Sequence, residues 1–96
     1  MNEFVGKVVV SAESKRRFVL TSITAVEMKA RAENLNERGV YDTYSWITVN
    51  SDPISRGELV FEDASSKEAF IKAFEAYCNS AEGRWERYEH FYFAWD

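Results

Sequence analysis

The sequence predicts an α+β fold in which two helices cover one face of an antiparallel sheet. Short runs of β-branched residues alternate with polar breaks, and two segments carry helix-capping patterns followed by apolar stripes. Hydrophobic residues make up 46% of the 96 residues. A chain of this size and composition buries one core without disulfides or metal, so residues 1–96 are expected to form a single domain.

Two strands joined by a polar hinge are expected at the N-terminus. Residues 4–10 (FVGKVVV) and 16–23 (RRFVLTSI) are rich in side chains that favour strands, and a hairpin is the economical connection between them. The basic cluster Lys15-Arg16-Arg17 lies at this hinge. Its simplest interpretation is a solvated turn, and its functional interpretation is an anchor for an acidic partner.

Residues 24–38 carry two competing patterns, of which we favour the helical one. Thr24 and Glu27 match a capping box, and Gly39 stands where helices commonly end in a left-handed turn. The apolar residues of the segment also alternate with charged ones, as they would in a strand. These residues are Val26, Met28, Ala30 and Ala32.

The second half of the chain is expected to supply two strands and a second helix. Residues 40–49 suit both faces of a sheet and are predicted as an interior strand, and residues 58–63 are predicted as a short strand. Between them, residues 50–57 contain the only proline and are predicted as a loop. Ser65 and Glu68 form a second capping box. An apolar helical stripe follows, formed by Phe70, Ile71, Phe74, Tyr77 and Cys78.

Residues 84–95 fit either a helix or a strand, and the order of the other elements favours the strand. The residues at helical spacing are Trp85, Tyr88, Tyr92 and Trp95. Against a helix, the HFYFAW run favours strands. From residue 16 onward the predicted order is strand, helix, strand, strand, helix, strand. That is the ferredoxin-like split βαβ order, with an extra N-terminal strand, and it requires a closing strand.

Because both helices of this arrangement pack on one face, the opposite face of the predicted sheet is open. We expect aromatic side chains from the last strand and from residues 40–49 to gather there. Packing of residues 84–95 into the core is the simpler alternative. A contiguous exposed patch of large rings usually marks an interaction site. The candidate partner-binding residues are Tyr44, Trp46, Tyr88, His90 and Tyr92, with Ile47 and Val49 as the alternative to the first two.

Binding to nucleic acid is disfavoured by the net charge of −4. Residues 55–70 loosely resemble the third strand and second helix of RNA-recognition-motif domains. That family places aromatic residues among glycines in this strand, whereas here Arg56-Gly57 is followed by Glu58. A carboxylate repels phosphate and does not stack on a base, so RNA binding is not expected.

No motif for catalysis, phosphate binding or metal binding is present. His90 is the only histidine, so a site with two histidine ligands cannot form within one chain. Cys78 lies on the apolar side of the second predicted helix and is expected to be buried and inert. We therefore expect neither enzymatic activity nor a cofactor nor a metal. A ligand-binding or catalytic pocket around His90, closed by a second subunit, is the alternative.

These observations lead to a cytoplasmic, non-catalytic domain that binds another protein, or a copy of itself, through an aromatic-rich sheet face or an edge strand. Cytoplasmic location and no membrane insertion are expected because the only cysteine cannot pair internally and the N-terminal apolar run is short. An alternative is an acidic inhibitor, in the style of phage and mobile elements, that offers host nucleic-acid-binding defence machinery carboxylates in place of phosphates. Its candidate acids are Glu58, Glu62, Asp63, Glu82, Glu86 and Glu89.

Overall fold

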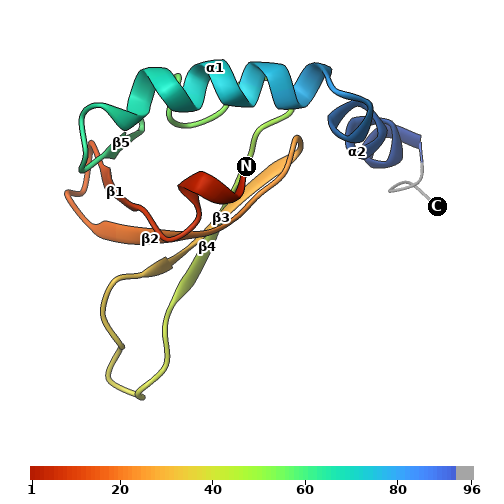
Figure 1. The fold of residues 1–96 in the computed structure, drawn as a ribbon. Coiled ribbons are helices and arrows are strands. Elements are labelled where there is room, and N and C mark those ends of the chain that lie inside the picture. Colours follow the sequence, from red (N-terminus) through yellow and green to blue (C-terminus); the bar gives the residue numbers. More distant parts are fainter. Residues whose placement is uncertain (93–96) are drawn as a thin grey trace.

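The computed structural model describes residues 1–92 of the chain, which form an antiparallel sheet with two helices (Figure 1). The helical elements are η1 (Asn2–Phe4), α1 (Ser66–Asn79) and α2 (Ala81–Tyr92). The strands are β1 (Val8–Ser11), β2 (Arg17–Ile23), β3 (Glu27–Ala32), β4 (Thr43–Ile47) and β5 (Leu59–Phe61). The predicted α+β class and antiparallel sheet are therefore confirmed.

The sheet has the order β4-β3-β2-β1-β5. β1 to β4 follow one another as antiparallel neighbours, and β5 returns to pair with the free side of β1. The chain must therefore cross from one edge of the sheet to the other between residues 48 and 58. This crossing segment buries Thr48, Pro53 and Ile54 on its way. α1 lies across the same side of the sheet, and α2 extends beyond the end of α1 (Figure 1).

The core lies between α1, the crossing segment and one face of the sheet. Alternate residues of each strand point into it, as the two-residue period of a strand requires. A bulge at Thr21 shifts the register of β2, so that Leu20 and Ile23 both face the core. The core residues are Phe4, Val9, Phe18, Leu20, Ile23, Met28, Ala30, Ile54, Leu59, Phe61, Phe70 and Phe74.

Residues 24–38 do not form the predicted helix. Thr24 Oγ1 accepts hydrogen bonds from the N–H groups of Val26 (3.3 Å) and Glu27 (3.0 Å), and so closes the tight turn between β2 and β3. The residues after it continue as β3, with Met28 buried and Lys29 exposed. The alternating pattern prevails because β3 pairs with a strand on each side, and these ladders outweigh local helix propensity.

The predicted strand over residues 84–95 is also wrong where the structure describes it, because α2 is a helix; residues 93–95 of that prediction lie outside the described residues. Ser80 Oγ accepts a hydrogen bond from the Gly83 N–H (3.2 Å) and caps this helix. With a strand at residues 27–32 and a helix at the C-terminal end, the ferredoxin-like order is not confirmed.

Several boundaries also differ from prediction. β4 is an edge strand and not an interior one, because β5 pairs with β1. The first strand begins at Val8, after a turn in which Gly6 has a φ of 93°. None of the helices formed by residues 1–92 has the length and apolar character that a bilayer crossing requires.

The helix predicted from Ser65 onward is confirmed as α1, but its cap differs. Asp63 accepts hydrogen bonds from the N–H (3.1 Å) and hydroxyl (2.7 Å) of Ser65 and from the Ser66 hydroxyl (3.1 Å). These bonds hold the pKa of the Asp63 carboxyl below its usual range. Of the predicted stripe, Phe70 and Phe74 are buried, and the others are half-buried.

Candidate functional site

The residues predicted to share one surface lie in two separate places. Tyr44 and Trp46 are half-buried on the core-facing side of β4, because they lie opposite Ala30 and Met28 in the sheet. Tyr88, His90 and Tyr92 lie on α2. The structure therefore does not assemble the predicted open sheet face. Ile47 and Val49 were the alternative to Tyr44 and Trp46, and of these Ile47 is on the open face and 57% exposed.

α2 carries a row of stacked aromatic side chains. Ring centroids are 5.4 Å apart for Trp85 and Tyr88, and 4.6 Å apart for Tyr88 and Tyr92. The three side chains are 55%, 45% and 65% exposed, in chain order. They occupy positions i, i+3 and i+7 and so share one side of the helix. We call Trp85, Tyr88 and Tyr92 the aromatic ridge. Phe91, beside it, is 51% exposed.

The other side of α2 attaches the helix to the body of the protein through polar contacts. The Glu86 carboxylate accepts hydrogen bonds from the Ala25 N–H (2.9 Å) and the Tyr77 hydroxyl (2.8 and 2.9 Å). The Arg87 guanidinium donates to the Ala25 carbonyl (3.1 Å) and to Cys78 Sγ (3.2 Å). Ala25 is fully buried in the β2–β3 turn, so Glu86 and Arg87 together satisfy its peptide groups.

The corner between the helices depends on a glycine. A Cβ atom at Gly83 would collide with the Tyr77 carbonyl oxygen and lie 2.9 Å from the Cys78 Cα atom. Only glycine therefore lets α2 approach the end of α1 this closely. This close approach and the contacts of Glu86 and Arg87 set the direction in which the aromatic ridge points.

Tyr77 makes the attachment of α2 sensitive to alkaline pH. Burial, followed by its hydrogen bond to Glu86, raises the pKa of the Tyr77 phenol above its usual value of 10.0. The folded protein therefore binds this proton more tightly than the unfolded chain does. The resulting stabilisation is complete below pH 10.0 and is lost as the pH rises through the folded-state pKa.

We expect the free energy of unfolding to fall more steeply above pH 10.0 in the native protein than in a Tyr77→Phe variant. Urea unfolding at a series of alkaline pH values measures both slopes. The comparison cancels the other tyrosines and the lysines, which titrate in both proteins. Equal slopes would contradict the role given to Tyr77.

Cys78 and His90 have the side chains best suited to acid–base or nucleophilic chemistry. Burial raises the pKa of the Cys78 thiol, which keeps it protonated and a weak nucleophile. His90 is half-buried, and its ring meets the Phe91 ring edge-on at 5.3 Å. Within residues 1–92, no group of three or more His, Cys, Asp or Glu side chains is placed to hold a metal ion.

Most of the predicted acidic surface residues bind to groups of their own chain. The pairs are Glu58 with Arg56, Glu62 with Arg17, Asp63 with Ser65, and Glu86 with Tyr77. Glu82 and Glu89 are exposed on α2. They lie three residues before and four residues after Trp85, which places both beside the aromatic ridge.

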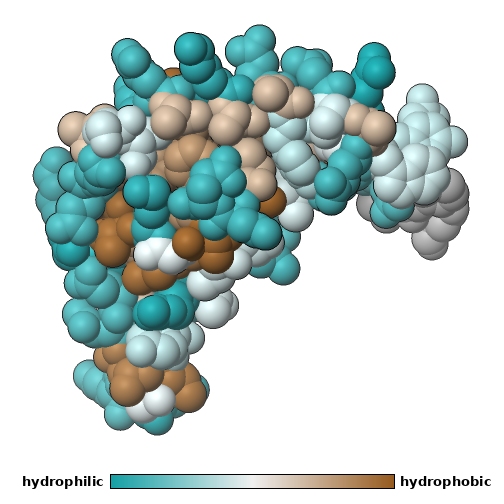
Figure 2. Space-filling model, in the orientation of Figure 1, coloured by the Kyte–Doolittle hydropathy of each residue, from teal (hydrophilic) through white to brown (hydrophobic). Residues whose placement is uncertain are grey.

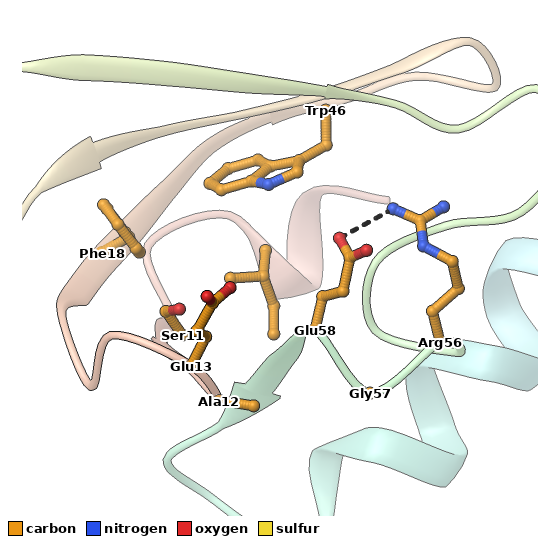
Figure 3. Close-up of a pocket in the computed structure, with 9 residues that line it drawn as sticks. Ser11, Ala12, Glu13, Phe18, Trp46, Arg56, Gly57 and Glu58 are labelled. Atoms are coloured by element: carbon orange, nitrogen blue, oxygen red, sulfur yellow. Dashed lines mark hydrogen bonds and ion pairs between the residues drawn. The ribbon is translucent and has the colours of Figure 1, made fainter.

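Trp46 forms one wall of a cleft of about 380 Å³ on the core-facing side of the sheet (Figure 3). Phe18 and Leu59 supply further apolar lining. The Arg56 guanidinium and the Glu58 carboxylate form an ion pair (3.0 Å) at its rim. The sequence did not reveal this cleft, because it depends on the path of the crossing segment.

The basic cluster near this cleft is used within the chain. The Arg16 guanidinium lies 5.6 Å from the ring centroid of Phe18 and 5.0 Å from that of Tyr44. Arg17 binds the carboxylates of Glu33 (3.0 Å) and Glu62 (2.9 Å) and lowers the pKa of Glu33. Lys15, Arg16 and Arg17 are all exposed, as the solvated-turn interpretation expects, and Arg16 and Arg17 make these contacts in addition.

A second exposed apolar feature lies at the tip of the loop between β3 and β4. The loop projects from the sheet (Figure 1), and hydrophobic atoms are exposed near its tip among hydrophilic ones (Figure 2). Leu35 and Val40 are each 55% exposed there. Asn36 braces the loop by accepting hydrogen bonds from the N–H groups of Arg38 and Val40. Scattered exposed aliphatic side chains are common on soluble proteins, so this tip ranks below the aromatic ridge.

Sequence reasoning missed Trp85 as a surface residue, although the helical spacing of the aromatic residues was visible. Ser80, which caps α2, was the second available signal. Comparison with protein-family models, curated proteins and solved structures finds no match to this chain.

Proposed function

We propose that this protein is a non-catalytic binding domain that inserts the aromatic ridge of α2 into an apolar groove of a protein partner. The observation that carries this proposal is the arrangement of α2. The helix is attached to the body by the polar side chains of Glu86 and Arg87, while its largest aromatic side chains are exposed. A helix that served only the fold would turn its apolar side inward.

The spacing and identity of the ridge residues support insertion into a groove. Anchors at i, i+3 and i+7 are the pattern by which an amphipathic helix occupies an apolar groove. Trp and Tyr are enriched among the residues that dominate binding energy. An isolated helix of this length is marginal in water, but here its inner-side contacts hold it in place. The ridge is therefore ordered before binding, which lowers the entropic cost of association.

The charges beside the ridge indicate the chemistry of the partner. Glu82 and Glu89 lie on one side of the ridge, whereas exposed Arg84 lies four residues before Tyr88 on the other side, so the rim of the groove should be basic where it meets the two glutamates. A nucleic-acid-binding protein would offer such a rim, and the acidic-inhibitor hypothesis is the form of this proposal that specifies that partner. At this surface the acidic-inhibitor form is supported by two carboxylates, those of Glu82 and Glu89. Because this charge is small, apolar contact should dominate the binding energy, and salt should weaken binding only modestly. A cytoplasmic location belongs to the proposal and is supported by the free thiol of Cys78.

Combining Tyr88→Ser with Tyr92→Ser should leave the fold intact and weaken binding to the partner about 1,000-fold, since aromatic anchors of this kind each contribute about 2 kcal/mol. The partner is first captured from the host lysate with the native protein and then purified. Isothermal titration calorimetry measures both dissociation constants, and circular dichroism checks the fold.

Tyr41→Ser is the matched control, because Tyr41 is also a tyrosine, 44% exposed, but lies in the β3–β4 loop. Its affinity should equal that of the native protein. A partner that binds the double variant as tightly as the native protein would overturn the proposal.

A further inference from the structure

β4 forms one edge of the sheet and leaves backbone groups directed away from it. The Ala32 N–H donates to the Asp42 carbonyl (2.7 Å), and the Thr48 N–H donates to the Val26 carbonyl (2.9 Å). These bonds show that the even-numbered residues of this segment direct their backbone N–H and C=O groups toward β3. In an antiparallel ladder the alternate residues direct their N–H and C=O groups the other way. Thr43, Ser45 and Ile47 therefore point their backbone groups outward.

This edge lacks the features that usually block strand addition. Natural edge strands are protected by proline, charged side chains, bulges or very short length. β4, with the sequence TYSWI, contains no proline and no charged residue, and its pairing with β3 is regular. Ile47 is 57% exposed on it. The opposite edge, β5, has only three residues.

We propose that β4 pairs antiparallel with β4 of a second copy of this chain, about a two-fold axis through Ser45. In this register Ser45 lies opposite Ser45 of the second copy, and Thr43 lies opposite Ile47 of the second copy. All these residues have outward backbone groups, so each opposed pair would exchange two N–H···O bonds. The two sheets then continue as one, and neither copy keeps a free edge at β4.

The side chains of β4 are self-complementary in this register. Tyr44 lies opposite Trp46 of the second copy at non-hydrogen-bonded positions, where side chains approach most closely. Both residues are half-buried in one copy, so pairing would cover more of each ring. Aromatic cross-strand pairs are among the favourable ones. On the open face, exposed Ile47 packs against Thr43 of the second copy, and both are β-branched.

The charges next to the edge are complementary in two of the three rows of this register. Glu27 lies beside Ile47, and Arg31 lies beside Thr43, in the pairing of β3 with β4. Two of the three open-face rows across the interface therefore run from Glu27 through Ile47 and Thr43 of the second copy to Arg31 of the second copy, so that each ends in an acid and a base. The central row runs from Lys29 through Ser45 and Ser45 of the second copy to Lys29 of the second copy, and in each copy Glu27 pairs with this lysine at 3.5 Å and offsets the like charges. The interface does not use the aromatic ridge, and the two proposals fail separately.

Sedimentation equilibrium over a range of concentrations should show a mass rising toward twice 11.1 kDa. Ile47→Lys should raise the dimer dissociation constant about tenfold or more, because a lysine at this edge would lose its hydration on pairing. Val60→Lys is the matched control, since Val60 is 49% exposed on the opposite edge strand. Its dissociation constant should equal that of the native protein.

Ser45→Pro is a second test, because it removes an outward N–H that β3 does not use. It should abolish pairing, while circular dichroism shows the native fold. In the native protein, hydrogen exchange at the amides of Thr43, Ser45 and Ile47 should slow as concentration rises. A monomer at every concentration would overturn the proposal. So would a dimer that is lost in Val60→Lys or in the Tyr88→Ser and Tyr92→Ser double variant but persists in Ile47→Lys.

Discussion

Replacing Phe70 with alanine is expected to lower the free energy of unfolding by about 3–5 kcal/mol. The Phe70 side chain is fully buried, and its ring centroid lies 5.3 Å from that of Phe4, 5.6 Å from that of Phe61 and 5.4 Å from that of Phe74. The substitution removes the ring that joins α1 to the N-terminal turn and to β5. Small domains have total stabilities of about 5–15 kcal/mol, so this single substitution should remove a large part of the total.

Phe91→Ala is the matched control, because it removes the same ring from a position that is 51% exposed. Its effect should stay within about 0.5 kcal/mol. Urea unfolding followed by far-ultraviolet circular dichroism measures both variants. Equal losses of stability in the two would contradict a core centred on Phe70.

Replacing Glu86 with alanine should cost about 2–3 kcal/mol, since it removes charge-assisted hydrogen bonds and leaves a buried donor unpaired. The Ala25 N–H and the Tyr77 hydroxyl both donate to this carboxylate. Without it, α2 loses half of its polar attachment to the β2–β3 turn. We therefore expect weaker partner binding as well, because the aromatic ridge would no longer be held in one direction.

Glu89→Ala separates this effect from a general loss of negative charge on α2. Glu89 is exposed on the same helix, so its removal should change stability by no more than about 0.5 kcal/mol. Thermal unfolding compares the two variants, and hydrogen exchange at the Ala25 amide reports the lost bond directly. If both variants are equally stable and this amide stays protected in Glu86→Ala, the attachment of α2 does not depend on Glu86.

The incorrect prediction for residues 24–38 has a definite physical origin. A threonine that caps a helix and a threonine that closes a tight turn both accept hydrogen bonds from N–H groups two and three residues later. Thr24 makes these bonds, so the local pattern was real and its continuation was ambiguous. Pairing of β3 with β2 and β4 decided the matter, and such pairing joins segments distant in sequence.

The strand prediction for residues 84–95 shows the opposite error, because a correct local signal for a helix was set aside. The spacing of Trp85, Tyr88 and Tyr92 indicated a helix, and Ser80 offered a cap for it. The strand was preferred because the presumed topology required one. Because residues 27–32 form strand β3, the predicted topology does not apply and no closing strand is required. The five-stranded sheet is built from β1 to β5.

The sequence by itself determined the α+β class, strand β2, strand β5, the loop before β5 and helix α1. In these segments the residue pattern and the final burial agree, so local information is sufficient. Only the tertiary structure decided which side of α2 faces the protein and that β4 is an edge. The attachment of Glu86 and Arg87 to Ala25 turns the aromatic ridge outward, and the return of β5 to β1 leaves β4 with one neighbour. Both outcomes depend on contacts between segments far apart in the chain, which no local pattern encodes.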